Sequence, residues 1–323
     1  MTTALSGVRV RAGLSGVAVA VPPRSEPVAD ILARNGATGS EQRLFTKVYE
    51  LRDSPTLEPG ARFEDLLVDV GRRSLAGGRA DLVLYGHTLL YQEHLYRPGF
   101  ADRVTTGLGL PGVPFYGLSH VACTSVLRAV EVAARFLDRP GAAEGERVLV
   151  LGGDHGSACD RSRVVPSTTV MGDAAVAFLV GRDTGRYRYL GGAGARDTRF
   201  HRSLRMTAED TALFWSVCTD LLVQAVDAAL ADAGLDRSDV DWVMPHLSNG
   251  MFWRSFSRAS GIARDRIRLD LLPERGHTFG VDALASLDHV DRRGELSVGD
   301  RCLLVSIGQG AYFRVAVVEV GEG

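Results

Sequence analysis

Short apolar runs alternate along the chain with longer segments in which apolar residues recur every three or four positions. The short runs are rich in Val and Leu and predict β-strands at 8–10, 17–21, 82–85, 113–118, 148–151, 174–180, 242–244, 303–307 and 313–320. The longer segments predict helices, several of which open after Gly, Ser, Thr or Asp, at 63–75, 123–137, 207–233, 250–260 and 281–290. This alternation indicates an α/β protein.

The chain also carries an internal duplication, because four landmarks recur in the same order at nearly constant spacing. Residues 80–84 match 240–244, and the helix opening at Cys123 matches one opening at His277. The strand at 147–153 matches 301–307, and a Gly-rich turn with a last strand follows each copy. We therefore predict two α/β halves, residues 1–184 and 185–323. Gly-Gly-Ala-Gly at 191–194 lacks the flanking unit of a dinucleotide site and is expected to be a bend.

Composition excludes several classes of function. The 323 residues are 45% hydrophobic and 24% charged, as in a soluble globular protein. A net charge of −2, without a basic run, argues against a nucleic-acid partner. We find no apolar stretch near the roughly 20 residues that cross a bilayer and no signal-type N-terminus, so we expect no membrane partner and a cytoplasmic location.

The cysteines give one candidate nucleophile and no metal site. The four are scattered without a C-x-x-C pair, and His87, His94, His155, His201 and His289 lack metal-ligand spacing, so we expect reduced thiols and no metal. Cys123 follows a strand and sits in the first turn of a predicted helix, where backbone N–H groups and the helix dipole favour a thiolate. A lone cysteine in a helix is more often a small buried residue, so context has to decide.

That context comes from five motifs whose order and spacing agree with one family from about Val8 to Val320. They are His-Val-Ala-Cys-Thr-Ser at 120–125, Met-Gly-Asp-Ala-Ala-Val-Ala at 171–177, Pro-His-Leu-Ser-Asn at 245–249, Gly-His-Thr at 276–278 and Gly-Gln-Gly at 308–310. The set resembles ketoacyl-ACP synthase III, whose counterparts are the nucleophile elbow, Gly-Asp-Gly-Ala, His-Gln-Ala-Asn, Gly-Asn-Thr and a C-terminal glycine turn.

The resemblance implies the thiolase-like fold, with two duplicated halves related by a pseudo-twofold axis, usually as a homodimer. Cys123 would take an acyl group from a CoA or acyl-carrier-protein thioester without a bound cofactor. The backbone N–H groups of Cys123 and Gln309 would hold the oxyanion, each such donor being worth roughly 10²–10³ in rate. His246 would hydrogen-bond to the thioester carbonyl and transfer protons.

His277 departs from the family pattern, which has Asn at this position in condensing members. A neutral imidazole can also donate one N–H, and a Cys-His-His set resembles the elongating, decarboxylating ketosynthases. Relatives that acylate hydroxyls or amines also vary this position. Decarboxylative condensation and transfer to a heteroatom therefore both stay open.

Recognition of the donor is less defined. Priming members offer Trp and Arg to the CoA adenine, yet residues 31–49 contain no Trp. The resemblance leaves as candidate CoA or phosphopantetheine contacts Asn249, Arg34, Arg43, Arg161 and Arg163, the last two of which also fit solvated surface arginines. In the stretch 88–104, aromatic and imidazole side chains would cap a pocket across the dimer or pack at its interface: Tyr91, His94, Tyr96 and Phe100.

We expect an acyltransferase that forms an acyl-Cys123 intermediate and passes the acyl group to a small-molecule hydroxyl or amine in secondary metabolism. The alternative within the same chemistry is decarboxylative Claisen condensation with a malonyl-type thioester. An alternative of another class is a non-catalytic ketosynthase-like subunit that supports a partner chain, although such subunits generally lose the nucleophile.

Overall fold

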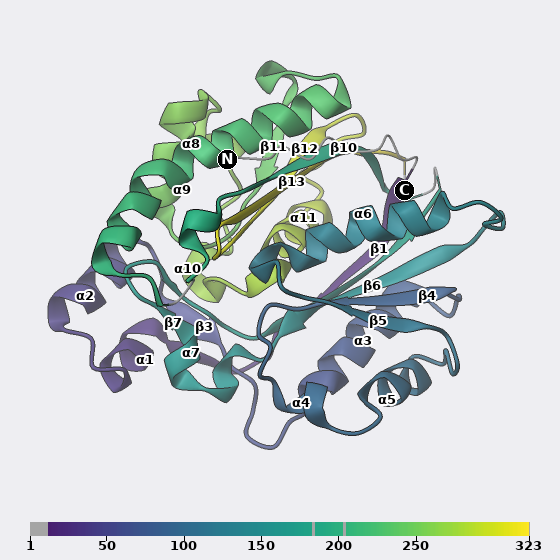
Figure 1. Ribbon diagram of the computed structural model, residues 1–323, viewed down its shortest axis with the longest axis horizontal. Helices are drawn as coiled ribbons and strands as arrows, with labels where there is room; N and C mark the ends of the chain where they lie inside the picture. Colours follow the sequence, from purple (N-terminus) through teal and green to yellow (C-terminus); the bar gives the residue numbers. More distant parts are fainter. Residues whose placement is uncertain (1–11, 183–184, 203–204, 323) are drawn as a thin grey trace.

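A nine-stranded mixed sheet runs through the computed structural model, which describes residues 12–182, 185–202 and 205–322 (Figure 1). In spatial order its strands are β11 (Trp242–Met244), β12 (Arg301–Gly308), β13 (Tyr312–Val320), β10 (Tyr187–Arg196), β1 (Ala12–Ala20), β9 (Ala174–Gly181), β6 (Arg147–Asp154), β4 (Leu82–Gly86) and β5 (Phe115–Leu118). The predicted strand 8–10 and residue 184, at which the first predicted half ends, lie outside the described residues.

Eleven α-helices of the described residues and two small two-stranded sheets complete the fold. The long helices are α3 (Phe63–Leu75), α6 (Ser125–Leu137), α8 (Ala208–Ala233), α9 (Gly250–Ser260) and α11 (Asp282–Arg292). The short ones are α1 (Val28–Arg34), α2 (Gly39–Arg43), α4 (Glu93–Tyr96), α5 (Phe100–Gly107), α7 (Asp160–Arg163) and α10 (Leu272–Arg275), with a π-helical turn at Leu44–Val48. The small sheets pair β2 (Ser25–Pro27) with β3 (Asp53–Pro55) and β7 (Val164–Val165) with β8 (Thr169–Val170).

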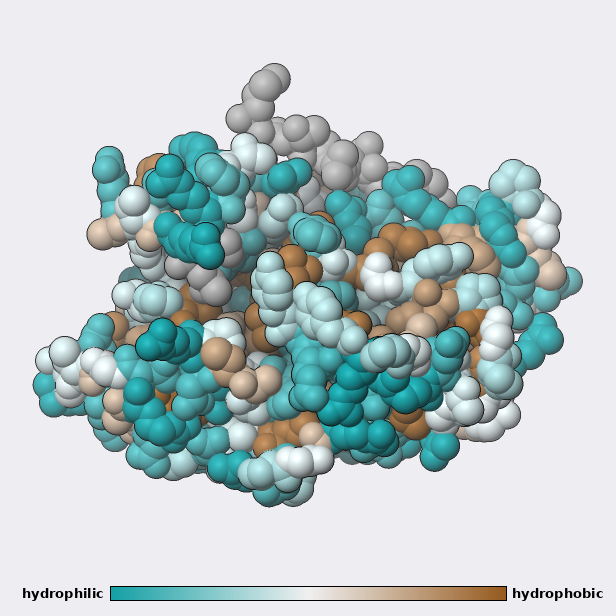
Figure 2. All heavy atoms as spheres, turned by 60° about the horizontal axis from the view of Figure 1, so that its bottom comes forward, coloured by the Kyte–Doolittle hydropathy of each residue, from teal (hydrophilic) through white to brown (hydrophobic). Residues whose placement is uncertain are grey.

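Alternate residues of each strand point to opposite sides of the sheet, and helices cover both sides. In β6, Val148 and Val150 join a core that includes α6 and α11, whereas Leu149 and Leu151 join a second core with α3. Alternate residues of β12 and β13 join the α6/α11 core, and the others pack against α8 and α9. Figure 1 shows α3 at the bottom of the view and α8 at its top. The rotated face is largely hydrophilic, with apolar atoms gathered in recesses (Figure 2).

The order of strands follows the duplication seen in the sequence. Every strand on one side of the sheet comes from residues 12–181, and every strand on the other side comes from residues 187–320. The two sides meet where β1 pairs antiparallel with β10 through three residue pairs, Ala12–Tyr189, Gly13–Arg188 and Leu14–Tyr187. The division into halves at 184/185 stays a prediction.

Two expectations need correction. The run 191–194 is not a bend but the middle of β10, where glycine permits a close approach: a Cβ on Gly191 would lie 2.9 Å from the backbone N of Ala233 in α8. In addition, α8 is long and apolar enough to span a membrane by length and composition, which the sequence reading overlooked. Its buried side chains pack on β10 and β13.

Candidate active site

Cys123 sits in a tight elbow between β5 and α6. The predicted helix begins slightly later than expected, since Ala122–Thr124 form a 3₁₀ turn and α6 starts at Ser125. Ala122 has a φ of 48°, a left-handed conformation that is costly for a residue with a Cβ and that concentrates at functional sites. The Cys123 side chain is buried but reaches the wall of a cavity.

The second half of the chain holds this elbow in place. Ser306 of β12 donates a hydrogen bond to the Cys123 carbonyl over 2.6 Å. A Cβ on Gly280 would lie 3.0 Å from that same carbonyl oxygen, and one on Gly308 would lie 3.2 Å from the Cys123 backbone N. Glycine at these two positions therefore lets the backbone of one half touch the backbone of the other.

A Cys-His-Asp chain of contacts crosses the interface between the halves. The His277 Nε2 lies 3.5 Å from the Cys123 Sγ, and its Nδ1 lies 2.6 Å from Oδ2 of Asp282. All three side chains are buried. The sequence reading found Cys123 and His277 but missed Asp282, which is the first residue of α11. The sequence did offer a signal for Asp282: it follows His277 by five positions and stands at the start of a helix.

Asp282 is tightly fixed. Its Oδ1 accepts hydrogen bonds from the backbone N and the hydroxyl of Thr278, and its Oδ2 also accepts one from the Leu247 backbone N. Burial alone would raise the pKa of Asp282, but His277, His246 and the Thr278 N–H outweigh it and hold that pKa below its usual range. Asp282 is thus a carboxylate that orients His277.

The two histidines carry different charges. Burial disfavours the His277 imidazolium, but the Asp282 carboxylate and Cys123 overcome this cost and raise the pKa of His277 to about 10. Burial, with a further contribution from His277, lowers the pKa of His246 to about 3. The two rings lie edge to face with centroids 4.2 Å apart. The site therefore pairs a protonated His277 with a neutral His246.

His246 follows β11 and is held through its backbone, since its carbonyl accepts a hydrogen bond from the Trp253 indole over 2.7 Å. Its Nδ1 has no hydrogen-bond partner among the described residues and lies 3.6 Å from Oδ2 of Asp282. His246, His277 and Asp282 could by spacing surround a metal ion. The 2.6 Å between His277 Nδ1 and Asp282 Oδ2 is a hydrogen-bond distance, which favours a proton over a metal ion between these two groups.

Cys123 and both histidines open into one cavity of about 600 Å³. Most of its other lining residues are apolar or aromatic, including Met171, Phe214, Trp215, Phe252 and Phe279. The predicted oxyanion residue Gln309 and its neighbour Gly308 also line the cavity, beside the Cys123 backbone. The cavity thus combines a nucleophile, a proton carrier and an apolar binding surface.

The predicted phosphate contacts fall outside this cavity. Arg34 pairs with Glu26 and Asp160, at 2.6 and 2.9 Å. Arg163 is not a solvated surface residue as expected: it is 1% exposed and donates hydrogen bonds to Ser54, Thr56 and the Met171 carbonyl. It braces the segment that pairs with the backbone of His277.

The three remaining candidates are also placed elsewhere. Arg43 and Arg161 are exposed and do not line the cavity. Asn249 is fully buried and caps α9: its oxygen accepts the Phe252 N–H over 2.8 Å, and its amide donates to the Thr168 carbonyl. Its side chain therefore has a structural role, and the predicted substrate contact stays a prediction.

The stretch 88–104 divides between cavity and core. Thr88, Leu89, Leu90 and Tyr91 line the active-site cavity, whereas Tyr96 projects into solvent. His94 and Phe100 are buried and pack against Phe63 and Tyr85, so they do not form the expected cap.

The buried Asp154 at the end of β6 anchors this stretch. Its carboxyl accepts N–H bonds from Thr88, Leu89 and the Gln92 side chain at 2.7 to 3.1 Å. Burial raises the pKa of Asp154 to about 7, against the opposing effect of these backbone donors.

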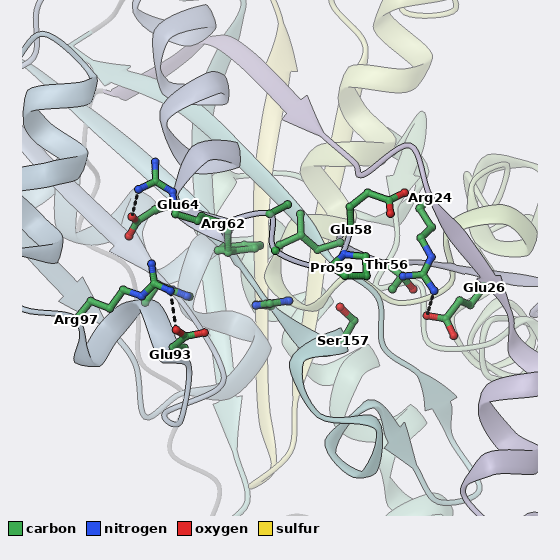
Figure 3. A pocket seen from close by; sticks show the side chains of 16 residues that line it. Arg24, Glu26, Thr56, Glu58, Pro59, Arg62, Glu64, Glu93, Arg97 and Ser157 are labelled. Atoms are coloured by element: carbon green, nitrogen blue, oxygen red, sulfur yellow. Dashed lines mark hydrogen bonds and ion pairs between the residues drawn. The ribbon is translucent and has the colours of Figure 1, made fainter.

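Figure 3 shows a second cavity, of about 350 Å³. His94, His155 and Phe63 are among the residues that line it. Each rim arginine faces an acid: Arg24 pairs with Glu26, Arg62 with Glu64 and Arg97 with Glu93 (Figure 3). No cysteine lines this cavity among the described residues.

Comparison with known proteins agrees with this geometry. Residues 230–320 match the family described as 3-oxoacyl-[acyl-carrier-protein] synthase III, C terminal. A β-ketoacyl-[acyl-carrier-protein] synthase III of Streptomyces coelicolor is 27% identical over 81% of this chain and 84% of its own length. One from Sphingopyxis alaskensis is 26% identical over 96% of this chain and 99% of its own.

Solved structures share the fold at low sequence identity. ChlB3, an acyltransferase, superposes with a TM-score of 0.82 at 17% identity, covering 96% of this chain and 98% of its own. The 3-oxoacyl-(acyl carrier protein) synthase III of Pseudomonas aeruginosa gives 0.80 at 19%, covering 97% and 99%. The chain therefore has the thiolase-like fold of these enzymes, and its residues 230–320 are similar to the C-terminal part of 3-oxoacyl-[acyl-carrier-protein] synthase III.

Proposed function

We propose that this enzyme takes an acyl group from a CoA or acyl-carrier-protein thioester onto Cys123 and transfers it to a hydroxyl or amine of a small molecule in secondary metabolism. The observation that carries the proposal is the contact chain from Cys123 through His277 to Asp282, at 3.5 and 2.6 Å. An aspartate-bound histidine is a general base, which a heteroatom acceptor needs and an asparagine cannot provide.

In the first step the Cys123 sulfur, its proton held by His277, attacks the thioester carbonyl. The oxyanion forms beside the backbone N–H groups of Cys123 and Gln309. When it collapses, the bond to the donor sulfur breaks, and that sulfur takes the proton from the His277 imidazolium. The products are free CoA or carrier thiol, acyl-Cys123 and a neutral His277.

In the second step the acceptor's O–H or N–H gives its proton to His277 Nε2 while its heteroatom attacks the acyl carbon. The carbon–sulfur bond breaks and Cys123 leaves as a thiolate. An ester or amide is released, and the thiolate–imidazolium pair is restored. The Asp282 carboxylate favours this return, because it raises the pKa of His277 to about 10. Neutral His246 is left to hydrogen-bond to the reacting carbonyl.

Decarboxylative condensation with a malonyl-type thioester is the second candidate. It is favoured by the names of the sequence relatives, which are β-ketoacyl-[acyl-carrier-protein] synthases III. In that reaction His246 and His277 would both donate to the enolate oxygen. A non-catalytic supporting subunit fits less well, since the chain holds a nucleophile and a matched base.

A homodimer is part of the proposal. β5 is an edge strand, and its Tyr116 is 62% exposed, so its free backbone groups could pair with a second copy. The mass of the native protein in solution tests this directly.

The function is tested in two stages on the intact chain. Mixing with acyl-CoA and with acyl-carrier protein should add one acyl mass at Cys123, and none in Cys123→Ala. The isolated acyl-enzyme is then offered labelled malonyl-carrier protein or a panel of alcohols and amines. Ester or amide formation without CO₂ release supports the proposal. Prompt CO₂ release with a new carbon–carbon bond would refute heteroatom transfer as the main activity.

A further inference from the structure

The described side chains that line the active-site cavity include positively charged groups but no carboxylate. Among the described residues that line it, the only side chains with a permanent charge are Arg202 and Arg205, and none is an aspartate or glutamate. Both arginines are exposed, so they lie at the solvent side of a cavity whose inner wall holds the buried Cys123.

The backbones of these two arginines are in contact. The backbone N of Arg205 donates to the Arg202 carbonyl over 2.9 Å, between β10 and α8. Within the part of the chain that the structure describes, neither guanidinium has a carboxylate partner. Of the acids that flank this segment in the sequence, Asp197 pairs with Arg199 at 2.6 Å and Asp210 caps α8 through Thr207, while Glu209 is exposed in the first turn of α8 and does not line the cavity.

The second cavity provides the contrast. There every rim arginine is matched by a glutamate, and Glu58 is also present, so that rim carries no excess of positive charge (Figure 3). At the active-site cavity the positive charge is left uncompensated. Guanidinium groups at the mouth of a low-dielectric cavity attract and bind anions.

We propose that Arg202 and Arg205 form an anion subsite at the mouth of the acyl cavity. It replaces the arginines expected from the sequence, since Arg34 is already paired, Arg163 is buried, and Arg43 and Arg161 lie outside the cavity. The anion is a phosphate of the donor's phosphopantetheine or CoA, or a carboxylate on the acceptor. Assigning it to donor or acceptor rests on the proposed acyl transfer; the subsite itself does not.

The subsite is tested first by alkylation of Cys123. Iodoacetate and iodoacetamide differ by one negative charge and react with the same thiol. Their rates at Cys123 are measured by peptide mass spectrometry in the native chain and in R202Q/R205Q. We expect the iodoacetate-to-iodoacetamide ratio to fall about threefold to tenfold in the variant at low salt, because lost focusing reduces the local anion concentration. In the native protein the ratio should also fall as salt is added.

The matched control is R43Q/R161Q, which removes two exposed arginines outside the cavity. It should leave the ratio unchanged. An equal fall in this control would assign the effect to overall charge and overturn the subsite. An unchanged ratio in R202Q/R205Q, with an unchanged melting temperature, would overturn it as well.

A second experiment, with two different acyl donors, tells whether the bound anion belongs to the donor or to the acceptor. Acylation of Cys123 is compared between an acyl-CoA and the matching acyl-N-acetylcysteamine thioester, which has no phosphate. A selective loss of about tenfold or more with the CoA donor in R202Q/R205Q assigns the subsite to the donor phosphate. A lowered alkylation ratio with an unchanged donor preference assigns it to an acceptor carboxylate. If Cys123 accepts no acyl group from either donor, the proposed function fails, while the alkylation ratio still judges the subsite.

Discussion

Oδ2 of Asp282 lies 2.6 Å from Nδ1 of His277, and the two residues are only five positions apart. The carboxylate therefore fixes the imidazole so that Nε2 points at Cys123 in the other half of the chain. The reactive set is thus a triad with an additional neutral histidine.

Replacing Asp282 by Asn keeps the size of the side chain but removes its charge. The ring of His277 would lose its orientation and its raised pKa, so we expect acylation of Cys123 to slow by about 10²- to 10⁴-fold. The alkaline limb of the pH–rate profile, set in the native enzyme by a pKa of about 10, should move to lower pH. Stopped-flow acylation from pH 6 to 10 measures both effects, and an unshifted limb would contradict the role of Asp282.

Substitution of His277 separates the two candidate reactions. If His277 acts as a base toward a hydroxyl or amine, both His277→Ala and His277→Asn abolish transfer from acyl-Cys123. If it only donates to an enolate oxygen, Asn retains some malonyl decarboxylation, and Ala loses roughly 2.7–4 kcal/mol of transition-state stabilisation. Following product and CO₂ from pre-acylated enzyme distinguishes these results.

The raised pKa of His277 also predicts how stability depends on pH. It lies at about 10 in the folded protein against an ordinary value of 6.5. The stabilisation from the charged imidazole is therefore fully present below pH 6.5 and is lost as the pH rises toward 10. The free energy of unfolding of the native chain, relative to His277→Asn, should decline across this window. Urea titrations at pH 6, 8 and 9.5 provide the measurement; a flat difference would show that the imidazole is not charged.

Asp154 is expected to act on substrate selection through the stretch that it anchors. Asp154→Asn removes one of the oxygens that accept the Thr88 and Leu89 N–H groups, which should loosen the cavity wall at Thr88–Tyr91. We predict that KM for longer acyl donors changes several-fold while kcat with the shortest donor changes little. Because the pKa of Asp154 is about 7, any pH dependence of KM between pH 6 and 8 that this carboxyl causes should disappear in the variant.

The sequence was informative where a pattern is local. Helices 63–75 and 250–260 were predicted with the bounds of α3 and α9, because their apolar periodicity and flanking residues are self-contained. β10 was missed, since its glycines resemble a turn until α8 is known to lie against them. The short helices α1 and α2 were also missed, because one or two turns leave little periodicity to read.

The same limit applies to the site. Motifs identified Cys123, His246 and His277, and the structure brings all three to one cavity. Asp282 escaped because its partner was read as an altered asparagine, for which no carboxylate is needed. The predicted phosphate contacts stay predictions, and the sequence could not place them for a different reason: whether an arginine is free depends on acids distant in sequence, such as Asp160 for Arg34.

Four glycines enclose the start of α6: Gly86, Gly152, Gly280 and Gly308. A Cβ on any of them would come within about 3 Å of Ala122, Cys123, Ser125 or Val126. In a deep mutational scan read out by activity, these positions would score as essential, although none carries a functional group. A position around this site that tolerates no substitution would therefore mark tight packing as often as a catalytic role. Measuring folding as well as activity would distinguish the two causes.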